Sequence, residues 1–220
     1  MNYMTKRLTL VMVMLCALAI VPCVASAAVI TLTFEGIGNN APVGNFYNGG
    51  AGPNYGIQFG ADALGLISGL AGGSGNFSGA PTMPTVIYFL SGPGDVMDVA
   101  AGFDTGFSFY YSAVVYPGSV SVWSGLDGTG SLLASLDLPV TPSGGSAECT
   151  YGNYCPWEPI GVAFSGIAES VNFSGVANYI AFDNVTLGAS IPTSGVPEPY
   201  TFLMLAGGLG IVALKRLRKA

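Results

Sequence analysis

Short alternating segments separated by glycine-rich turns constrain the fold of this chain most strongly. Each segment carries β-branched or aromatic residues at alternate positions, the pattern of a strand with one buried face. Glycine, asparagine and proline fill the intervals and provide the backbone conformations that turns need. The segments lie at residues 29–34, 85–90, 106–111, 119–123, 132–138, 160–164, 170–173 and 179–182. Strands at this spacing predict a single all-β domain, a jelly-roll-like β-sandwich over residues 28–190.

The sequence supports more specific predictions for two stretches of residues 28–190, the body of the chain. Residues 119–136 predict a β-hairpin with Asp127-Gly128 at its tip. Residues 65–84 are rich in glycine and predict a loop over one edge of the sandwich. Long exposed helices are not expected, because the chain has 33 glycines and each costs about 1 kcal/mol in a helix interior.

The charged residues are segregated along the chain. All six basic residues lie near the two ends, whereas every acidic residue except Glu198 lies within residues 28–196. A body without cations cannot neutralise phosphates, which argues against nucleic-acid binding. It also lacks the histidine and lysine side chains that most often act as general bases and nucleophiles. The remaining carboxylates, carbonyls and hydroxyls are the oxygen ligands that suit calcium.

The first 27 residues have the pattern of a secretory signal peptide. A basic pair at residues 6–7 precedes an apolar run at residues 8–21, and small residues at 25–27 provide a site for signal peptidase. We expect cleavage after Ala27. The alternative is a retained membrane-spanning helix, but the apolar run is shorter than the ~20 residues that cross a bilayer.

The other end of the chain combines a linker, an apolar segment and a basic tail. Residues 191–199 contain Pro197-Glu198-Pro199, residues 200–214 are predicted as a transmembrane helix, and residues 215–220 carry four basic side chains. The apolar segment is short but can span a locally thinned bilayer. The positive-inside bias would keep the tail cytoplasmic and place the body in the periplasm.

The order of the Pro-Glu-Pro tripeptide, the apolar segment and the basic end resembles the PEP-CTERM sorting signal. This resemblance implies that exosortase, a membrane protease-transpeptidase, recognises Pro197, Glu198 and Pro199 and removes the tail. It also implies delivery to the cell surface or to the exopolysaccharide matrix of a Gram-negative bacterium. The alternative is a plain tail anchor that holds a periplasmic binding domain in the inner membrane.

Two cysteines remain after the signal peptide is removed. Cys149 and Cys155 are expected to form a disulfide on the oxidising side of the membrane. A metal site would need two further ligands of the right type, and a redox role would be expected to use a C-x-x-C spacing.

Two acidic residues mark the first and last predicted strands of the body. Glu35 follows Phe34, and Asp183 precedes Asn184. The first and last strands of a jelly roll often run side by side, and a close carboxylate pair without a cation is costly unless an ion such as Ca²⁺ binds. The layout resembles carbohydrate-binding β-sandwich modules, in which an early Phe-Glu and a late Asp-Asn bracket a structural calcium. The alternative is that Asp183-Asn184 forms a turn and Glu35 ends a strand in solvent.

Aromatic side chains are the candidates for carbohydrate contact. We expect Trp157, near the disulfide loop, to be the best exposed, and Tyr110 or Tyr111 to face the core. The candidates are Trp123, Trp157, Tyr110, Tyr111, Tyr151 and Tyr154. The sequence therefore predicts a non-catalytic structural or carbohydrate-interaction protein with no catalytic residues. A glycan-active enzyme with paired carboxylates is a further alternative, although no such pair stands out.

Overall fold

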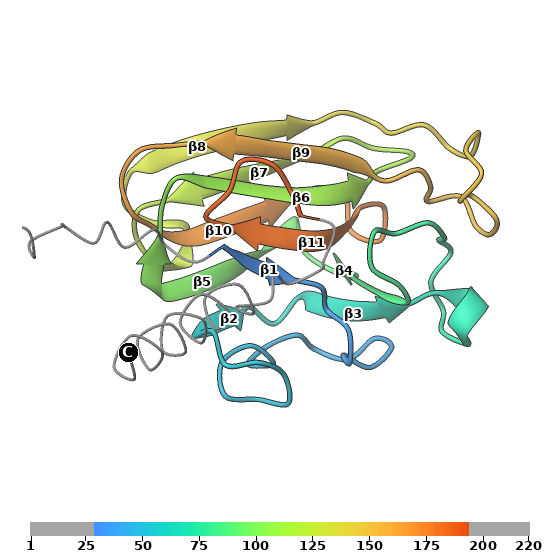
Figure 1. The fold of residues 1–220 in the computed structure, drawn as a ribbon, viewed down its shortest axis with the longest axis horizontal. Helices are drawn as coiled ribbons and strands as arrows, with labels where there is room; N and C mark the ends of the chain where they lie inside the picture. The colour runs from blue at the N-terminus through green and yellow to red at the C-terminus, as the bar shows by residue number, and fades with distance from the viewer. Residues whose placement is uncertain (1–28, 194–220) are drawn as a thin grey trace, which may run out of the picture.

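The computed structural model describes residues 29–193, which form two packed β-sheets (Figure 1). The first sheet has the order β3-β4-β11-β6-β9 with β1 beside β11, and the second has the order β2-β5-β10-β7-β8. All strand pairs are antiparallel. The strands are β1 (Ile30–Leu32), β2 (Ile57–Phe59), β3 (Ala63–Ile67), β4 (Thr85–Phe89), β5 (Gly94–Phe103), β6 (Gly106–Ser112), β7 (Gly118–Trp123), β8 (Leu132–Leu138), β9 (Glu158–Ala163), β10 (Ala168–Ser174) and β11 (Ala181–Leu187). The predicted all-β sandwich is confirmed.

Aromatic side chains dominate the core between the sheets. Phe107 and Phe109 alternate along β6 and meet Phe173 of β10 and Phe182 of β11, with ring centroids 4.9–6.1 Å apart. Each of the four is at most 2% exposed, and complete burial of such a side chain contributes about 1.5–3 kcal/mol. Tyr111, two residues further along β6, is also buried. This agrees with the expectation that Tyr110 or Tyr111 faces the core.

A second, smaller apolar cluster covers part of the outer face of the first sheet. Along β4, Ile87 and Phe89 belong to the main core, so Val86 and Tyr88 face the other way. Phe77 and Ala80, from the segment before β4, pack against that outer face together with other members of the cluster. The glycine-rich segment therefore lies on the outside of a sheet, and residues 65–67, predicted as part of this loop, belong to β3.

Three strands were absent from the prediction, namely β2, β3 and β5. The longest, β5, contains Asp95 at a buried position, which weakens its apolar alternation. The Asp95 carboxylate accepts hydrogen bonds from the backbone N–H groups of Gly60 and Asp62, at 3.1 and 3.2 Å. These donors offset the cost of burying a polar group, and burial still raises the pKa of Asp95 to about 6.

The predicted hairpin is confirmed, because β7 pairs with β8 and the 3₁₀ helix η2 (Leu126–Gly128) occupies its tip. A second 3₁₀ helix, η1 (Gly69–Ala71), lies after β3. Within residues 29–193, no helix has the length and apolar character needed to cross a membrane. The predicted signal peptide, Pro-Glu-Pro motif, membrane helix and basic tail lie outside the described residues.

Candidate functional site

The two predicted metal-binding carboxylates contact the same short segment. Strand β1 pairs with β11, with Leu32 opposite Val185, so the expected pairing of the first and last strands is confirmed. Glu35 Oε1 accepts a hydrogen bond from the Thr85 backbone N–H at 2.9 Å. Asp183 Oδ2 accepts one from the Thr82 backbone N–H at 2.8 Å. Residues 82–85 thus connect the two carboxylates.

A β-bulge in β11 shapes this site. The pairing of β11 with β6 shifts register between Asp183 and Thr186, and Asn184 has a positive φ of 47°. Asn184 Oδ1 accepts a hydrogen bond from the Thr82 hydroxyl at 2.7 Å, so the side chains of Asp183 and Asn184 both reach Thr82. Both are fully buried inside a strand rather than in a turn.

Burial makes the charged form of Asp183 costly. The pKa of Asp183 is raised to about 8, chiefly by desolvation and to a smaller extent by the nearby Glu35, while the N–H donors of Thr82 and Asn184 oppose the shift. Desolvation also raises the pKa of Glu35. No lysine, arginine or histidine occurs in residues 29–193, so no side chain of the described body can supply a compensating positive charge.

The donor set of this site matches the chemistry of calcium. Glu35 and Asp183 supply carboxylates, and Asn184 and Thr82 supply an amide oxygen and a hydroxyl, all of which are hard oxygen ligands. Residues 29–193 contain no group of three or more acidic, histidine or cysteine side chains placed to hold a metal. A calcium ion here would therefore complete its shell with neutral oxygens, from the protein or from water.

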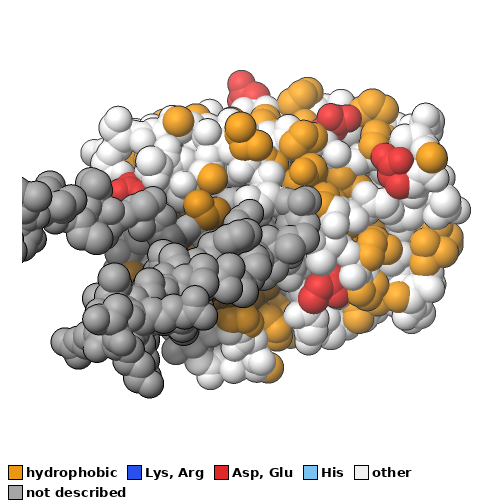
Figure 2. All heavy atoms as spheres, viewed as in Figure 1, with side chains coloured by type: hydrophobic (Ala, Val, Ile, Leu, Met, Phe, Trp, Pro, Cys, Tyr) orange, Lys and Arg blue, Asp and Glu red, His pale blue; other side chains and the backbone are white. Residues whose placement is uncertain are grey.

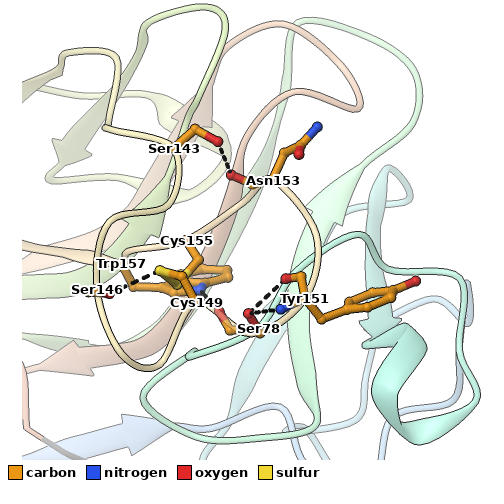
Figure 3. Close-up of a disulfide and its surroundings, with 8 residues drawn as sticks. All are labelled: Ser78, Ser143, Ser146, Cys149, Tyr151, Asn153, Cys155 and Trp157. Carbon is orange, nitrogen blue, oxygen red and sulfur yellow. Dashed lines mark hydrogen bonds between the residues drawn. A yellow bond between two sulfur atoms is a disulfide. The ribbon is translucent and has the colours of Figure 1, made fainter.

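The predicted disulfide between Cys149 and Cys155 is confirmed (Figure 3). The loop that it closes is fixed to the segment before β4. The Ser78 hydroxyl donates to the Tyr151 carbonyl at 2.7 Å and accepts from the Tyr151 N–H at 3.0 Å. The Asn76 carbonyl accepts the N–H groups of the two residues that precede Cys155, at 3.2 Å each.

The prediction that Trp157 is exposed is wrong. Its side chain is 7% exposed and lies beside the disulfide (Figure 3). The indole N–H donates to the Ser78 carbonyl at 3.0 Å, and the ring contacts Phe77 edge-on with centroids 5.8 Å apart. Trp157 is buried because the segment 76–80 and the disulfide loop cover this part of the first sheet, and that layer could not be inferred from local sequence.

An open groove of about 550 Å³ lies beside this covering layer, on the outer face of the first sheet. Leu66 of β3, Tyr88 of β4 and Ala181 of β11 contribute to its lining. Its size is typical of a small-molecule site. Amide and aromatic residues complete much of the lining, namely Asn40, Asn76, Asn153, Tyr154, Asn178 and Tyr179. None of the described lining residues carries a charge.

Hydrogen bonds and ring contacts hold the polar and aromatic lining in place. The Tyr88 hydroxyl donates to Asn40 Oδ1 at 2.5 Å, and the Tyr154 hydroxyl donates to the Asn178 carbonyl at 3.4 Å. At the rim, Tyr179 meets Tyr116 edge-on with centroids 4.9 Å apart. The groove is therefore lined by tyrosine rings, amides and hydroxyls, several of which are held in place by contacts within the protein.

The structure separates the aromatic candidates named from the sequence. Tyr154 lines the groove, Tyr110 is half-buried beside the small cluster, and Tyr151 is exposed on the disulfide loop. Trp123 lies on β7, in the other sheet. Tyr88 and Tyr179 were missed, since nothing in the neighbouring sequence marks the outer face of β4 as a groove.

The described part of the surface carries acidic and apolar side chains without a basic one. Figure 2 shows acidic side chains scattered singly among hydrophobic and uncharged ones on the face in view. A surface of this kind repels anionic polymers and membranes.

No protein-family model and no curated protein matches the chain. Among solved structures, the K2 cleaved adhesin domain of Lys-gingipain aligns with a TM-score of 0.44 and 17% identity, over 73% of this chain and 97% of that one. The K1 cleaved adhesin domain of Lys-gingipain from Porphyromonas gingivalis W83 aligns with a TM-score of 0.39 and 14% identity, over 73% and 98%. A carbohydrate-binding module from Cellvibrio mixtus lichenase 5A, in complex with cellotriose, aligns with a TM-score of 0.35 and 11% identity, over 58% and 86%.

Proposed function

We propose that the chain is an exported, non-catalytic domain that binds uncharged carbohydrate in the groove on the first sheet. The observation that carries this proposal is the lining of the groove. Tyrosine rings and asparagine amides occur together there, and none of the described lining residues is charged. Aromatic rings stack on the apolar faces of sugar rings, and amides exchange hydrogen bonds with hydroxyl groups. A few such polar groups in an otherwise apolar site fix the orientation of a ligand.

The same lining favours binding over catalysis. Glycoside hydrolysis commonly uses two carboxylates that flank the bond to be broken, and no described residue lining the groove is acidic. The carboxylates of half-buried Glu35 and fully buried Asp183 instead contact the backbone of residues 82–85. We assign this pair to a structural Ca²⁺ ion, which would compensate their charge and hold that segment against β11.

The sorting proposal concerns the two ends of the chain. Residues 1–27 would direct export, and exosortase would act at Pro197, Glu198 and Pro199 before release to the surface or the exopolysaccharide matrix. The supporting observation is the order of motif, apolar segment and basic tail. We expect the intact mass of the protein from its native host to show a form that begins at Ala28 and lacks the residues after the motif. A single form that keeps residues 200–220 in the inner membrane would instead identify a tail-anchored periplasmic domain.

Replacing Tyr179 with alanine is expected to weaken sugar binding about two- to tenfold, because loss of one stacking ring removes about 0.5–1.5 kcal/mol. Tyr179 is 37% exposed at the rim of the groove. The measurement is isothermal titration of the purified protein with three neutral oligosaccharides, namely cellotetraose, maltotetraose and mannotetraose.

Tyr55 provides the matched control for this substitution, because it is 40% exposed and does not line the groove. Tyr55→Ala should leave the affinity within twofold of the wild-type value. Equal losses in the two variants would show that the groove is not the binding site, and an absence of binding to all three sugars would argue against the proposed function.

A further inference from the structure

Trp123 lies on the outer face of the second sheet, on the side of the sandwich opposite the groove. Val120 and Val122 of β7 belong to the main core. The alternating residues Ser119, Ser121 and Trp123 therefore point away from the core, because successive strand residues face opposite sides. The groove lies on the outer face of the first sheet, so the two surfaces are separated by the whole sandwich.

The indole of Trp123 lies along its strand. Its Nε1 donates to the Ser121 hydroxyl at 2.9 Å, and Ser121 is the preceding residue on the same face. Such residues are about 6.8 Å apart along a strand, so the ring must extend back over the strand to make this bond. The bond satisfies the only polar atom of the indole, and the half-buried ring is left as a contact surface.

Short polar side chains continue this surface across three strands. Asn172 of β10 lies opposite Ser121, and Ser121 lies opposite Ser135 of β8. In the next row, Ser119 lies opposite Asp137. We define the Trp123 platform as Trp123, Ser121, Asn172 and Ser135.

The hairpin tip closes one end of the platform. Ser170, opposite Trp123 in the pairing of β10 with β7, is fully buried. Its hydroxyl accepts from the Gly128 N–H at 2.9 Å and donates to the Gly125 carbonyl at 2.5 Å. The Asp127 N–H donates to Asp98 Oδ1 at 2.8 Å. The tip of the hairpin is therefore folded back across β10 and β5, and it places Asp127 beside Asp98 of β5 at the end of the platform.

We propose that the Trp123 platform is a second carbohydrate-contact surface, which takes a chain of uncharged sugars lying flat across β7 and its neighbours. The half-buried indole of Trp123 suits the apolar face of a pyranose ring, and the surrounding hydroxyls and amide match sugar hydroxyl groups. A protein partner would call for an apolar patch depleted of such small polar residues. Anionic chains are disfavoured by Asp98, Asp127 and Asp137 at the borders.

Tryptophan fluorescence provides a readout specific to this surface. The chain contains only two tryptophans, and Trp157 is buried and does not line the groove. Titration of the purified full-length protein with hydroxyethylcellulose, dextran or guar galactomannan is expected to shift or quench the emission for at least one polymer. Alginate, an anionic polymer, should leave it unchanged. If no neutral polymer changes the emission, or if alginate changes it equally, the proposal is overturned.

Two variants separate the platform from the groove. Trp123→Ala should abolish the fluorescence response and weaken binding to the responding polymer at least tenfold, while calorimetric binding of oligosaccharide in the groove is kept. Tyr179→Ala should weaken groove binding and leave the Trp123 response intact. Trp123→Phe, which retains a ring, should bind more tightly than Trp123→Ala if both variants unfold at the wild-type temperature. Unchanged polymer affinity in Trp123→Ala, or loss of the Trp123 response in Tyr179→Ala, would overturn the proposal.

Discussion

Replacing Phe109 with alanine is expected to destabilise the domain by about 3–5 kcal/mol. Phe109 is fully buried, and its ring contacts Phe107, Phe173 and Phe182 with centroids 5.5–6.1 Å apart. These rings come from β6, β10 and β11 and so join the two sheets. Truncation removes the transfer free energy of the ring and leaves a cavity that neighbouring aromatic rings cannot readily fill. Because small domains are stable by only about 5–15 kcal/mol, much of the total would be lost.

Urea unfolding monitored by far-ultraviolet circular dichroism measures this effect as a lower midpoint at an unchanged slope. Leu132 on β8 is the control, because it is 53% exposed and Leu132→Ala should change the stability by less than about 0.5 kcal/mol. A loss below about 1 kcal/mol in Phe109→Ala would contradict the packing of the two sheets around this cluster.

The fold could be predicted largely because alternation along a strand is a local signal. In β6, every second residue from Phe107 to Tyr111 is aromatic and enters the core, and the period is visible in the sequence itself. Strand β5 was missed because Asp95 interrupts the apolar alternation. Its carboxylate is satisfied by backbone donors near residues 60–62, and such long-range compensation has no sequence signature.

The carboxylate site and the groove differ in the same way, because only the first follows from a pattern visible in the sequence. The proximity of Glu35 and Asp183 could be predicted because it follows from the pairing of the first and last strands. The groove could not be predicted, since Asn40, Tyr88, Tyr154 and Tyr179 come from four separate segments and meet only on the folded sheet. The same outer layer buries Trp157, so a judgement of its exposure from neighbouring residues alone was bound to fail.

Metal-free protein is expected to lose stability as the pH rises from about 4 to about 8. The pKa of Asp183 is about 8 in the folded state, against an ordinary value of 3.8, and the pKa of Glu35 shifts in the same direction. Below the unfolded pKa, both states are protonated and the stability is fully present. Above it, only the unfolded chain releases the proton, so each pH unit costs up to about 1.4 kcal/mol until the folded pKa is reached. The total loss from Asp183 is at most about 6 kcal/mol.

Added Ca²⁺ should offset part of this pH dependence. The ion binds the ionised carboxylates, so it should stabilise the protein strongly at pH 8 and little at pH 5. At a concentration one hundred times its dissociation constant, the expected gain is about 2.7 kcal/mol. The measurement is thermal unfolding at both pH values, in EDTA and in millimolar CaCl₂.

Asp183→Asn is the matched variant, because an amide oxygen can still accept the Thr82 N–H but carries no charge. It should remove most of the pH dependence and the response to calcium together, while keeping the fold. A calcium response that persists in this variant would place the ion elsewhere. Strong pH dependence in the wild-type protein without any calcium response would show a protonated carboxyl pair, with residues 82–85 held by hydrogen bonds alone. The pH dependence of stability and the stabilisation by calcium can therefore vary separately. Only the loss of both in Asp183→Asn supports a calcium ion shared by Glu35 and Asp183.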